Sequence, residues 1–144
     1  NVLFTYANAD DGGRAINHAI EQFVSKNKNK YCVVKSLGQL KYLSAMKHVD
    51  LLIGNTSSGI IEAASFHKPV VNIGDRQKGR LQSGNVINCN IENIPNAIIQ
   101  ALSDEFSTRC EKVTNVYGDG LAAEKIVQQL EFQQFDSVKR FYDL

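Results

Sequence analysis

Hydrophobic residues along this chain gather in five short runs separated by polar turns. The runs are rich in β-branched residues and are too short for helices, so each predicts a buried strand. They lie at residues 2–6, 31–34, 51–53, 70–73 and 85–89. We expect a helix in every connection except the last.

The longer stretches repeat apolar residues every three or four positions, the period that gives a helix one apolar face. The stripes are formed by Ile16, Ala19, Ile20, Phe23 and Val24, by Leu40, Leu43 and Met46, by Ile60, Ile61, Ala63, Ala64 and Phe66, by Ile94, Ala97, Ile98, Ala101 and Leu102, and by Ala122, Ile126, Val127 and Leu130. Strands that alternate with helices predict an α/β fold, with a Rossmann-like parallel sheet covered by helices on both faces. We expect one such domain over residues 1–144.

Composition and charge are those of an ordinary globular domain. Of the 144 residues, 43% are hydrophobic and 22% are charged, which suits one sizeable core. The net charge of +1 is spread along the chain, so we expect no nucleic-acid partner. No apolar run approaches a membrane span, so we expect no membrane partner. Three cysteines without paired spacing predict a cytoplasmic location. Three histidines without ligand spacing predict no metal, and we expect no cofactor.

The segment from Gly54 to Gly59 stands between a predicted strand and a predicted helix and reads GNTSSG. Its glycines allow a tight turn and a close approach of a ligand to the backbone. Its hydroxyls, together with the unpaired amides of a helix N-terminus, are donors suited to an anion. Two interpretations stay open. The segment either forms a phosphate site or caps a helix in the ordinary way, as Ser and Thr do in any protein.

Glu62 follows this turn at a spacing that does not fit a capping box. With Ser58 as the cap the glutamate stands one position too far along, and with Gly59 as the cap no side chain completes the box. We therefore expect the Glu62 carboxylate to be available for another partner. It either accepts hydrogen bonds from ribose hydroxyls, as acidic residues do in dinucleotide folds, or only complements the helix dipole.

A second polar loop, GDRQKGR, follows the run at 70–73 and contains three cations, of which Arg76 is the first. Ligands of parallel sheets bind at the carboxyl ends of the strands, so we expect this loop on the same rim as the Thr56 turn. The loop is either a solvated segment with Asp75 paired to a neighbour, or an anion site in which Arg76 holds phosphate oxygens bidentately.

Taken in order, these motifs resemble the carboxyl-terminal half of hydrolysing UDP-N-acetylglucosamine 2-epimerases. The motifs are GNTSSG at 54–59 with Glu62, PVVNIGDRQ at 69–77 with Gly79-Arg80 and Asn85-Val86, NAD at 8–10 with Gly12, and YGDG at 117–120. The non-hydrolysing epimerases carry an Asp-Ser-Gly-Gly turn and a Thr-Glu-Arg-Pro-Glu loop at the corresponding places. Since this chain has neither, it is similar to the hydrolysing branch.

The resemblance implies the second half of a two-domain fold of the glycosyltransferase-B type. It also implies an enzyme that eliminates UDP from UDP-N-acetylglucosamine and hydrates the glycal intermediate to N-acetylmannosamine, the first step toward sialic acids. The family's catalytic carboxylates lie mainly in the amino-terminal half. We therefore expect no catalytic residue here and an inactive fragment. The chain opens at Asn1 with a strand, which we interpret as the start of an excised piece, and we expect a helix at about 131–144 to pack on the missing half.

The resemblance further implies the contacts to UDP. The expected binding residues are Asn8, Leu37, Thr56, Ser57, Ser58, Gly59, Glu62 and Arg76. The Thr56 turn and Glu62 contact phosphate and ribose in this assignment, and Arg76 contacts the diphosphate. Asn8 contacts the nucleotide, and Leu37 contacts the uracil through its backbone.

Two other functions stay open. Because the missing half reads most of the sugar, the substrate is alternatively a UDP-diacetamido-trideoxy sugar of bacterial glycan pathways. Outside enzymes, the alternative is a nucleotide-sugar-binding module without chemistry of its own. The expected partners are the UDP-sugar, the missing amino-terminal domain and, for a homo-oligomeric parent, further copies of the full-length enzyme.

Overall fold

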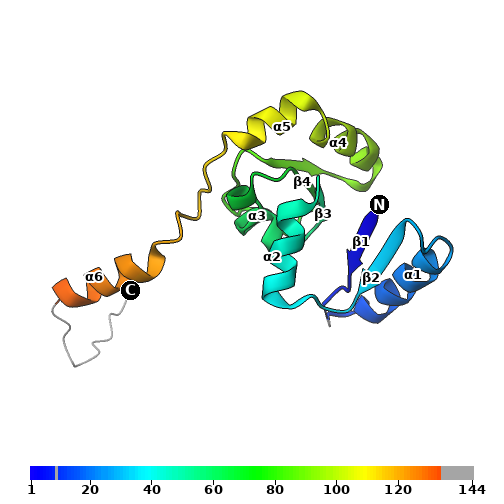
Figure 1. The fold of residues 1–144 in the computed structure, drawn as a ribbon, viewed down its shortest axis with the longest axis horizontal. Coiled ribbons are helices and arrows are strands. Elements are labelled where there is room, and N and C mark those ends of the chain that lie inside the picture. Colours follow the sequence, from blue (N-terminus) through cyan, green and yellow to red (C-terminus); the bar gives the residue numbers. More distant parts are fainter. Residues whose placement is uncertain (9, 134–144) are drawn as a thin grey trace, which may run out of the picture. The chain divides into compact units, whose positions relative to one another are not determined.

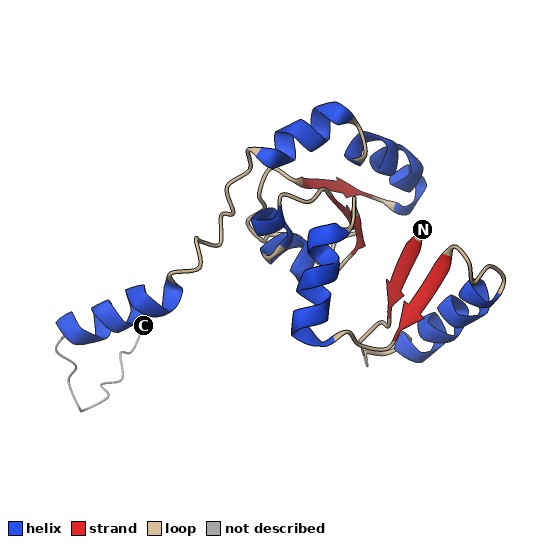
Figure 2. Ribbon diagram, in the orientation of Figure 1, coloured by secondary structure: helices blue, strands red, loops and turns tan. Residues whose placement is uncertain are grey.

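The chain forms two compact units in the computed structural model, which describes residues 1–8 and 10–133. The first unit comprises Asn1–Val49 and the second Asp50–Leu144 (Figure 1). Each strand pair of the described chain is parallel, and a helix lies between successive strands except between β4 and β5 (Figure 2). The predicted α/β class with parallel strands is confirmed.

The elements lie close to their predicted positions. The strands are β1 (Val2–Thr5), β2 (Tyr31–Val34), β3 (Leu52–Gly54), β4 (Val70–Ile73) and β5 (Val86–Cys89). The helices are α1 (Gly13–Ser25), α2 (Gly38–His48), α3 (Ser57–Ile61), α4 (Ile94–Ala101), α5 (Asp104–Glu111) and α6 (Ala122–Phe132), with 3-10 segments η1 (Ala63–Phe66) and η2 (Ile91–Asn93). Strands β2 and β4 have the predicted bounds, and the other strands differ by one residue at one or both ends.

The first unit is a parallel strand pair whose crossover is helix α1. Strand β1 pairs with β2 from Val2 opposite Tyr31 to Thr5 opposite Val34. The ring of Phe23 in α1 lies 6.1 Å from that of Phe4 in β1 and 4.9 Å from that of Tyr31 in β2. This aromatic cluster fixes the helix on the strand pair.

The second unit contains a three-stranded sheet in the order β3-β4-β5. Successive side chains of β4 point to opposite faces, as in any strand. Val71 packs with Ala97 and Ala101 of α4 on one face. Val70 points to the other face and lies against α3, where a Cβ added at Gly59 would come 3.0 Å from its Cγ1. Helices thus cover both faces of this sheet, as predicted.

Between β3 and β4 the structure differs from the prediction. The apolar stripe predicts one helix, but α3 ends at Ile61 and the tighter η1 follows. The C-cap of η1 is His67, which adopts a φ of 54°, and Pro69 then leads into β4. Because the residue before a proline avoids the α conformation, the chain has to leave the helix by Lys68. The short connection is closed with a 3-10 turn instead of a longer helix.

Helix α5 is absent from the predicted set, because only Phe106 and Cys110 of this helix are buried and two residues do not make a stripe. A start signal is present, since the Ser103 hydroxyl accepts a hydrogen bond from the Phe106 backbone amide at 3.2 Å. The helix predicted at about 131–144 falls mostly on residues 134–144, which lie outside the described residues. No helix in the described part of the chain is long and apolar enough to cross a membrane. The single domain over residues 1–144 stays a prediction.

Candidate functional site

The register of the second sheet sets where the turn after β3 and the loop after β4 begin. Strand β3 pairs with β4 so that Gly54 lies opposite Asn72. Because the two strands run in the same direction, the turn after Gly54 and the loop after Ile73 leave the sheet at the same edge. The two segments therefore start side by side.

The GNTSSG turn presents hydroxyls at the start of α3. Gly54 has a φ of 148°, a conformation that residues with a Cβ rarely adopt. Thr56 is the N-cap, and its Oγ1 accepts a hydrogen bond from the Ser58 amide at 3.3 Å. The cap is thus neither Ser58 nor Gly59, the two positions considered from the sequence. Because Thr56 takes the capping role, the hydroxyls of Ser57 and Ser58 are left for other partners.

Glu62 has a partner within the same turn. The Ser58 hydroxyl donates a short hydrogen bond to Glu62 Oε2, so the carboxylate is not wholly available as expected. Glu62 is also the C-cap of α3, because the helix ends one residue earlier. A carboxylate at a helix C-terminus is not favoured by the dipole of α3, but Glu62 is also the N-cap of η1, where a negative charge is favoured. With α3 only five residues long, the dipole itself is small.

The loop after β4 (residues 74–85) presents its cations to solvent and buries one amide. Gly74 turns the chain with a φ of 72°, and Arg76 and Lys78 are exposed. Gln77, between them, is only 3% exposed. Its Nε2 donates to the backbone carbonyl of Asn55 at 2.8 Å. Since Asn55 immediately precedes the Thr56 cap, this bond ties the cation-bearing loop to the hydroxyl-bearing turn.

The far half of the loop is tied down separately. Gln82 and Asn88 exchange amide hydrogen bonds of 3.2 and 2.7 Å, and Asn72 donates to the same Asn88 side chain at 2.8 Å. The Tyr117 hydroxyl donates to the Leu81 carbonyl at 2.9 Å. Sequence reasoning did not identify these amide contacts, because amides within a charged loop are indistinguishable from solvated ones until burial is known.

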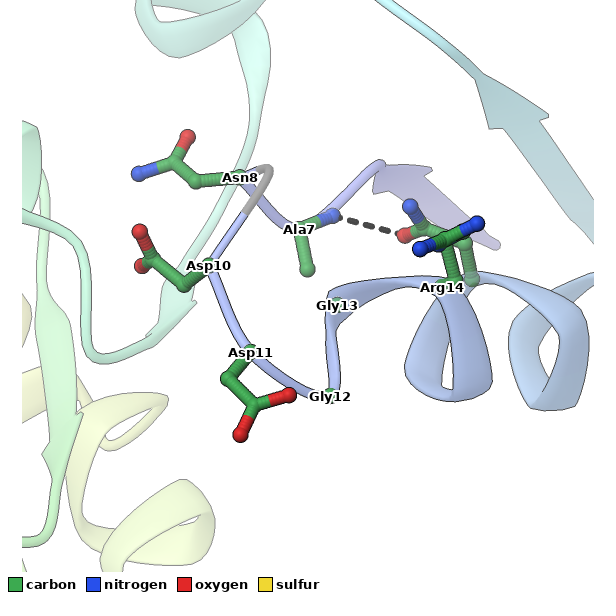
Figure 3. A pocket seen from close by; sticks show the side chains of 8 residues that line it. Ala7, Asn8, Asp10, Asp11, Gly12, Gly13 and Arg14 are labelled. Carbon is green, nitrogen blue, oxygen red and sulfur yellow. Dashed lines mark hydrogen bonds between the residues drawn. The ribbon is translucent and has the colours of Figure 1, made fainter.

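The first unit contains a pocket of about 560 Å³ at the start of α1 (Figure 3). The Ala7 backbone amide donates to Asn17 Oδ1 at 2.8 Å, which fastens the loop after β1 to the helix. Figure 3 shows the side chains of Asn8 and Asp10 projecting from this loop. The lining residues are Ala7, Asn8, Asp10, Asp11, Gly12, Gly13, Arg14 and Asn17. Most of the lining residues have polar side chains, and the predicted residue Asn8 is one of them.

Leu37 lies in the loop between β2 and α2, immediately before α2, and is half-buried. Asn8 follows β1 and Leu37 follows β2, so the parallel pairing puts both loops at one edge of that strand pair. The predicted residues are therefore found at two sheet edges. Those of the first unit are Asn8 and Leu37, and those of the second are Thr56, Ser57, Ser58, Gly59, Glu62 and Arg76.

We expect Gly13→Ala to destabilise the first unit by about 1–3 kcal/mol, the usual cost of overpacking. A Cβ added at Gly13 would lie 2.2 Å from the Asn8 carbonyl oxygen, so the Asn8 backbone has to move. Urea unfolding followed by the amide NMR signals of β1 measures the change. Helix propensity alone would make alanine stabilising by up to about 1 kcal/mol, so a stabilised variant would contradict the steric contact.

Two side chains with shifted pKa values belong to the scaffold. Burial raises the pKa of the Cys110 thiol, against the opposing charge of Arg109, so the thiol stays protonated at neutral pH and is a poor nucleophile. The pKa of Asp119 is lowered by the hydrogen bond from the Leu121 amide and by Lys125, whose Nζ lies 3.0 Å away. Asp119 of the YGDG motif thus bonds to Leu121 and Lys125 at the start of α6.

Comparison with known proteins gives consistent matches. The family model described as UDP-N-acetylglucosamine 2-epimerase matches residues 1–131. The GDP/UDP-N,N'-diacetylbacillosamine 2-epimerase (hydrolyzing) of Campylobacter jejuni is 40% identical over 147 residues, which cover 100% of this chain and 38% of that protein. The UDP-N,N'-diacetylbacillosamine 2-epimerase (hydrolyzing) of Legionella pneumophila is 36% identical over 124 residues, covering 86% of this chain and 32% of that protein.

The fold also matches a solved structure. The UDP-GlcNAc 2-epimerase of Methanocaldococcus jannaschii superposes with a TM-score of 0.63 at 18% identity, over 91% of this chain and 36% of that chain. That likeness supports the glycosyltransferase-B type of α/β fold. The chain spans less than two fifths of the length of the two curated relatives described above.

Proposed function

The chain belongs to the UDP-N-acetylglucosamine 2-epimerase family, and from that premise we propose that it is the UDP-binding half of a hydrolysing epimerase. The hydrogen bond from Gln77 Nε2 to the Asn55 carbonyl is the observation behind this proposal. It holds exposed cations beside a turn of hydroxyls and backbone amides at one sheet edge. Positive charge combined with such donors suits a diphosphate.

Each predicted residue has a role in this proposal. The turn from Thr56 to Gly59 surrounds one phosphate with hydroxyls and amides. Arg76 pairs with the diphosphate oxygens, and Glu62 accepts from the ribose hydroxyls through the carboxylate oxygen that Ser58 does not use. In the first unit, Asn8 contacts the nucleotide and the backbone at Leu37 contacts the uracil.

The chemistry follows from what these groups do to a departing UDP. When the bond from the sugar to the diphosphate breaks, negative charge grows on the diphosphate, and fixed cations and amides stabilise it. No group in this chain is assigned to move protons at the sugar. We assign that work to a partner domain in the remainder of the longer enzyme. In this proposal the present chain is one Rossmann-like domain, and the enzyme is cytoplasmic.

The sugar has two candidates. With UDP-N-acetylglucosamine, the product is N-acetylmannosamine, a precursor of sialic acids. With a UDP-diacetamido-trideoxy sugar, the product belongs to bacterial glycan synthesis. The names of the Campylobacter and Legionella relatives favour the second candidate, since both refer to N,N'-diacetylbacillosamine.

Titration of the 144-residue chain with UDP and uridine tests the nucleotide site, and product analysis with each UDP-sugar tests the chemistry. We expect weak binding of UDP, weaker binding of uridine and no turnover, because catalysis needs positioned acid and base groups and our proposal assigns none to this chain. The longer parent should release UDP from one of the two sugars. Equal affinity for UDP and uridine, or turnover by this chain alone, would overturn the proposal.

We expect Glu62→Gln to weaken UDP binding by about 1.5 kcal/mol, the size of a hydrogen bond to a charged group. The neutral amide accepts more weakly from the ribose hydroxyls and from Ser58. Calorimetric titration with UDP measures the loss.

A matched ligand and a matched variant complete the Glu62 experiment. With 2',3'-dideoxy-UDP, wild type and Glu62→Gln should bind equally, because the ribose hydroxyls are gone. Ser58→Ala should still lose affinity for the dideoxy ligand, since its hydroxyl belongs to the turn around the phosphate and does not contact the ribose. An undiminished effect of Glu62→Gln on the dideoxy ligand would show that Glu62 does not read the ribose.

A further inference from the structure

Gln77 is a buried amide among exposed cations. It is 3% exposed, although Gln is mostly found at protein surfaces. Its Nε2 donates to the Asn55 carbonyl at 2.8 Å, whereas its Oε1 is buried and accepts no hydrogen bond from the described residues. A buried acceptor without a donor is destabilising. Packing alone therefore does not account for glutamine, because an apolar side chain would fill the same space without that cost.

The position of this hydrogen bond links two candidate phosphate contacts. Asn55 directly precedes the Thr56 cap, and Gln77 directly follows Arg76. A tight turn surrounds the pair Arg76-Gln77, because the Lys78 amide donates to the Asp75 carbonyl at 3.0 Å. Any rotation of the backbone at Gln77 would therefore carry Arg76 with it. One side-chain hydrogen bond thus couples the guanidinium to the hydroxyl turn, although the two lie about twenty residues apart in the chain.

The far half of the loop is held independently. Gln82 pairs with the Asn88 side chain through both of its amide atoms. The side chain of Gln77 bonds the near half of the loop to the turn at Asn55. Two glutamines of one loop, Gln77 and Gln82, consequently hold different parts of it.

We propose, on the basis of the function proposed above, that Gln77 is a positioning residue for the diphosphate and holds Arg76 in register with the Thr56 turn. When this bond is lost, the near half of the loop is no longer fastened to the Thr56 turn, and a ligand that needs both segments binds less well. A ligand without phosphates needs neither segment in register. The expected signature is therefore a loss of affinity for UDP without a loss for uridine.

Titration of Gln77→Met with UDP and uridine measures this signature. Met keeps the length and apolar body of the side chain but cannot donate to the Asn55 carbonyl. We expect about a fivefold loss for UDP, the size of one hydrogen bond, and less than about a twofold change for uridine. Gln82→Met, in the same loop, is the matched control and should bind UDP within about twofold of wild type.

A double variant shows whether Gln77 acts through Arg76. In the Arg76→Ala background, Gln77→Met should cause no further loss of UDP affinity, since the group that it positions is gone. Full additivity in the double variant would overturn the proposal. Parallel losses for UDP and uridine in Gln77→Met would also overturn it, because they indicate general damage to the fold.

Failure of this inference is distinct from failure of the proposed function. If wild type binds UDP no better than uridine, both the proposed nucleotide site and the proposed role of Gln77 are wrong. If wild type prefers UDP to uridine and Gln77→Met keeps the full preference, only the proposed role of Gln77 is wrong. Should Gln77→Met not fold, the side-chain amide NMR signal of Gln77 in wild type decides. We expect UDP to shift this signal and uridine not to, and an unshifted signal at saturating UDP would overturn the proposal.

Discussion

Replacing Ile60 with alanine should lower the free energy of unfolding of the second unit by about 2–5 kcal/mol, the range found for large-to-small changes in cores. The Ile60 side chain is 0% exposed. It stands in α3 beside the buried residues Ala63 and Ala64 of η1, whose side chains are too small to refill the space. Because whole domains are stable by only about 5–15 kcal/mol, this single change should leave the unit marginal.

Ile99→Ala is the matched control for this change, since Ile99 also lies on a helix of the second unit but is 70% exposed. Substitutions at such surfaces stay within about 0.5 kcal/mol. Because two compact units need not unfold together, urea titrations should follow the amide NMR signals of β4 rather than total helicity. Equal destabilisation by Ile60→Ala and Ile99→Ala would show that α3 is not part of the core.

The fold class could be predicted because its determinants are local. The β-branched runs at β2 and β4 are bounded by polar turns on both sides, and both strands have the predicted ends. The stripe of α1 is similarly clear, and its residue Phe23 packs on both strands of the first unit. In α1 the pattern predicts the packing of Phe23 and the burial of Val24, whereas Ile16 and Ala19 of the same stripe are exposed.

Other features could not be predicted, because they depend on choices between chemically similar groups. Thr56, Ser57 and Ser58 are all good caps, and only the structure shows that Thr56 takes the role. That choice decides what Glu62 does, since it releases Ser58 to bond the carboxylate. The burial of Gln77 also depends on the tertiary structure, because its charged neighbours in the sequence RQK predict an exposed side chain.

Arg76→Ala should weaken UDP binding by roughly 2–3 kcal/mol, the upper range for charge-assisted hydrogen bonds, and leave uridine binding unchanged. Arg76 stands in the loop that Gln77 ties to the Thr56 turn, so its guanidinium can share one diphosphate with the turn amides. A guanidinium makes two parallel hydrogen bonds to phosphate oxygens, whereas an ammonium acts as a point charge. Arg76→Lys should therefore lose most of what Arg76→Ala loses, although the charge is kept.

Lys78→Ala separates this bidentate contact from simple attraction between charges. Lys78 is also exposed and lies two residues further along the same loop, so its removal changes the net charge equally. We expect it to cost less than about 0.5 kcal/mol of UDP affinity, with an effect that disappears at high salt because a steering charge is screened. The loss in Arg76→Ala should persist at high salt, since a direct hydrogen-bonded pair is screened less. If Arg76→Lys binds UDP like wild type, or if Lys78→Ala costs as much as Arg76→Ala, the loop attracts the diphosphate by charge alone and Arg76 makes no bidentate contact.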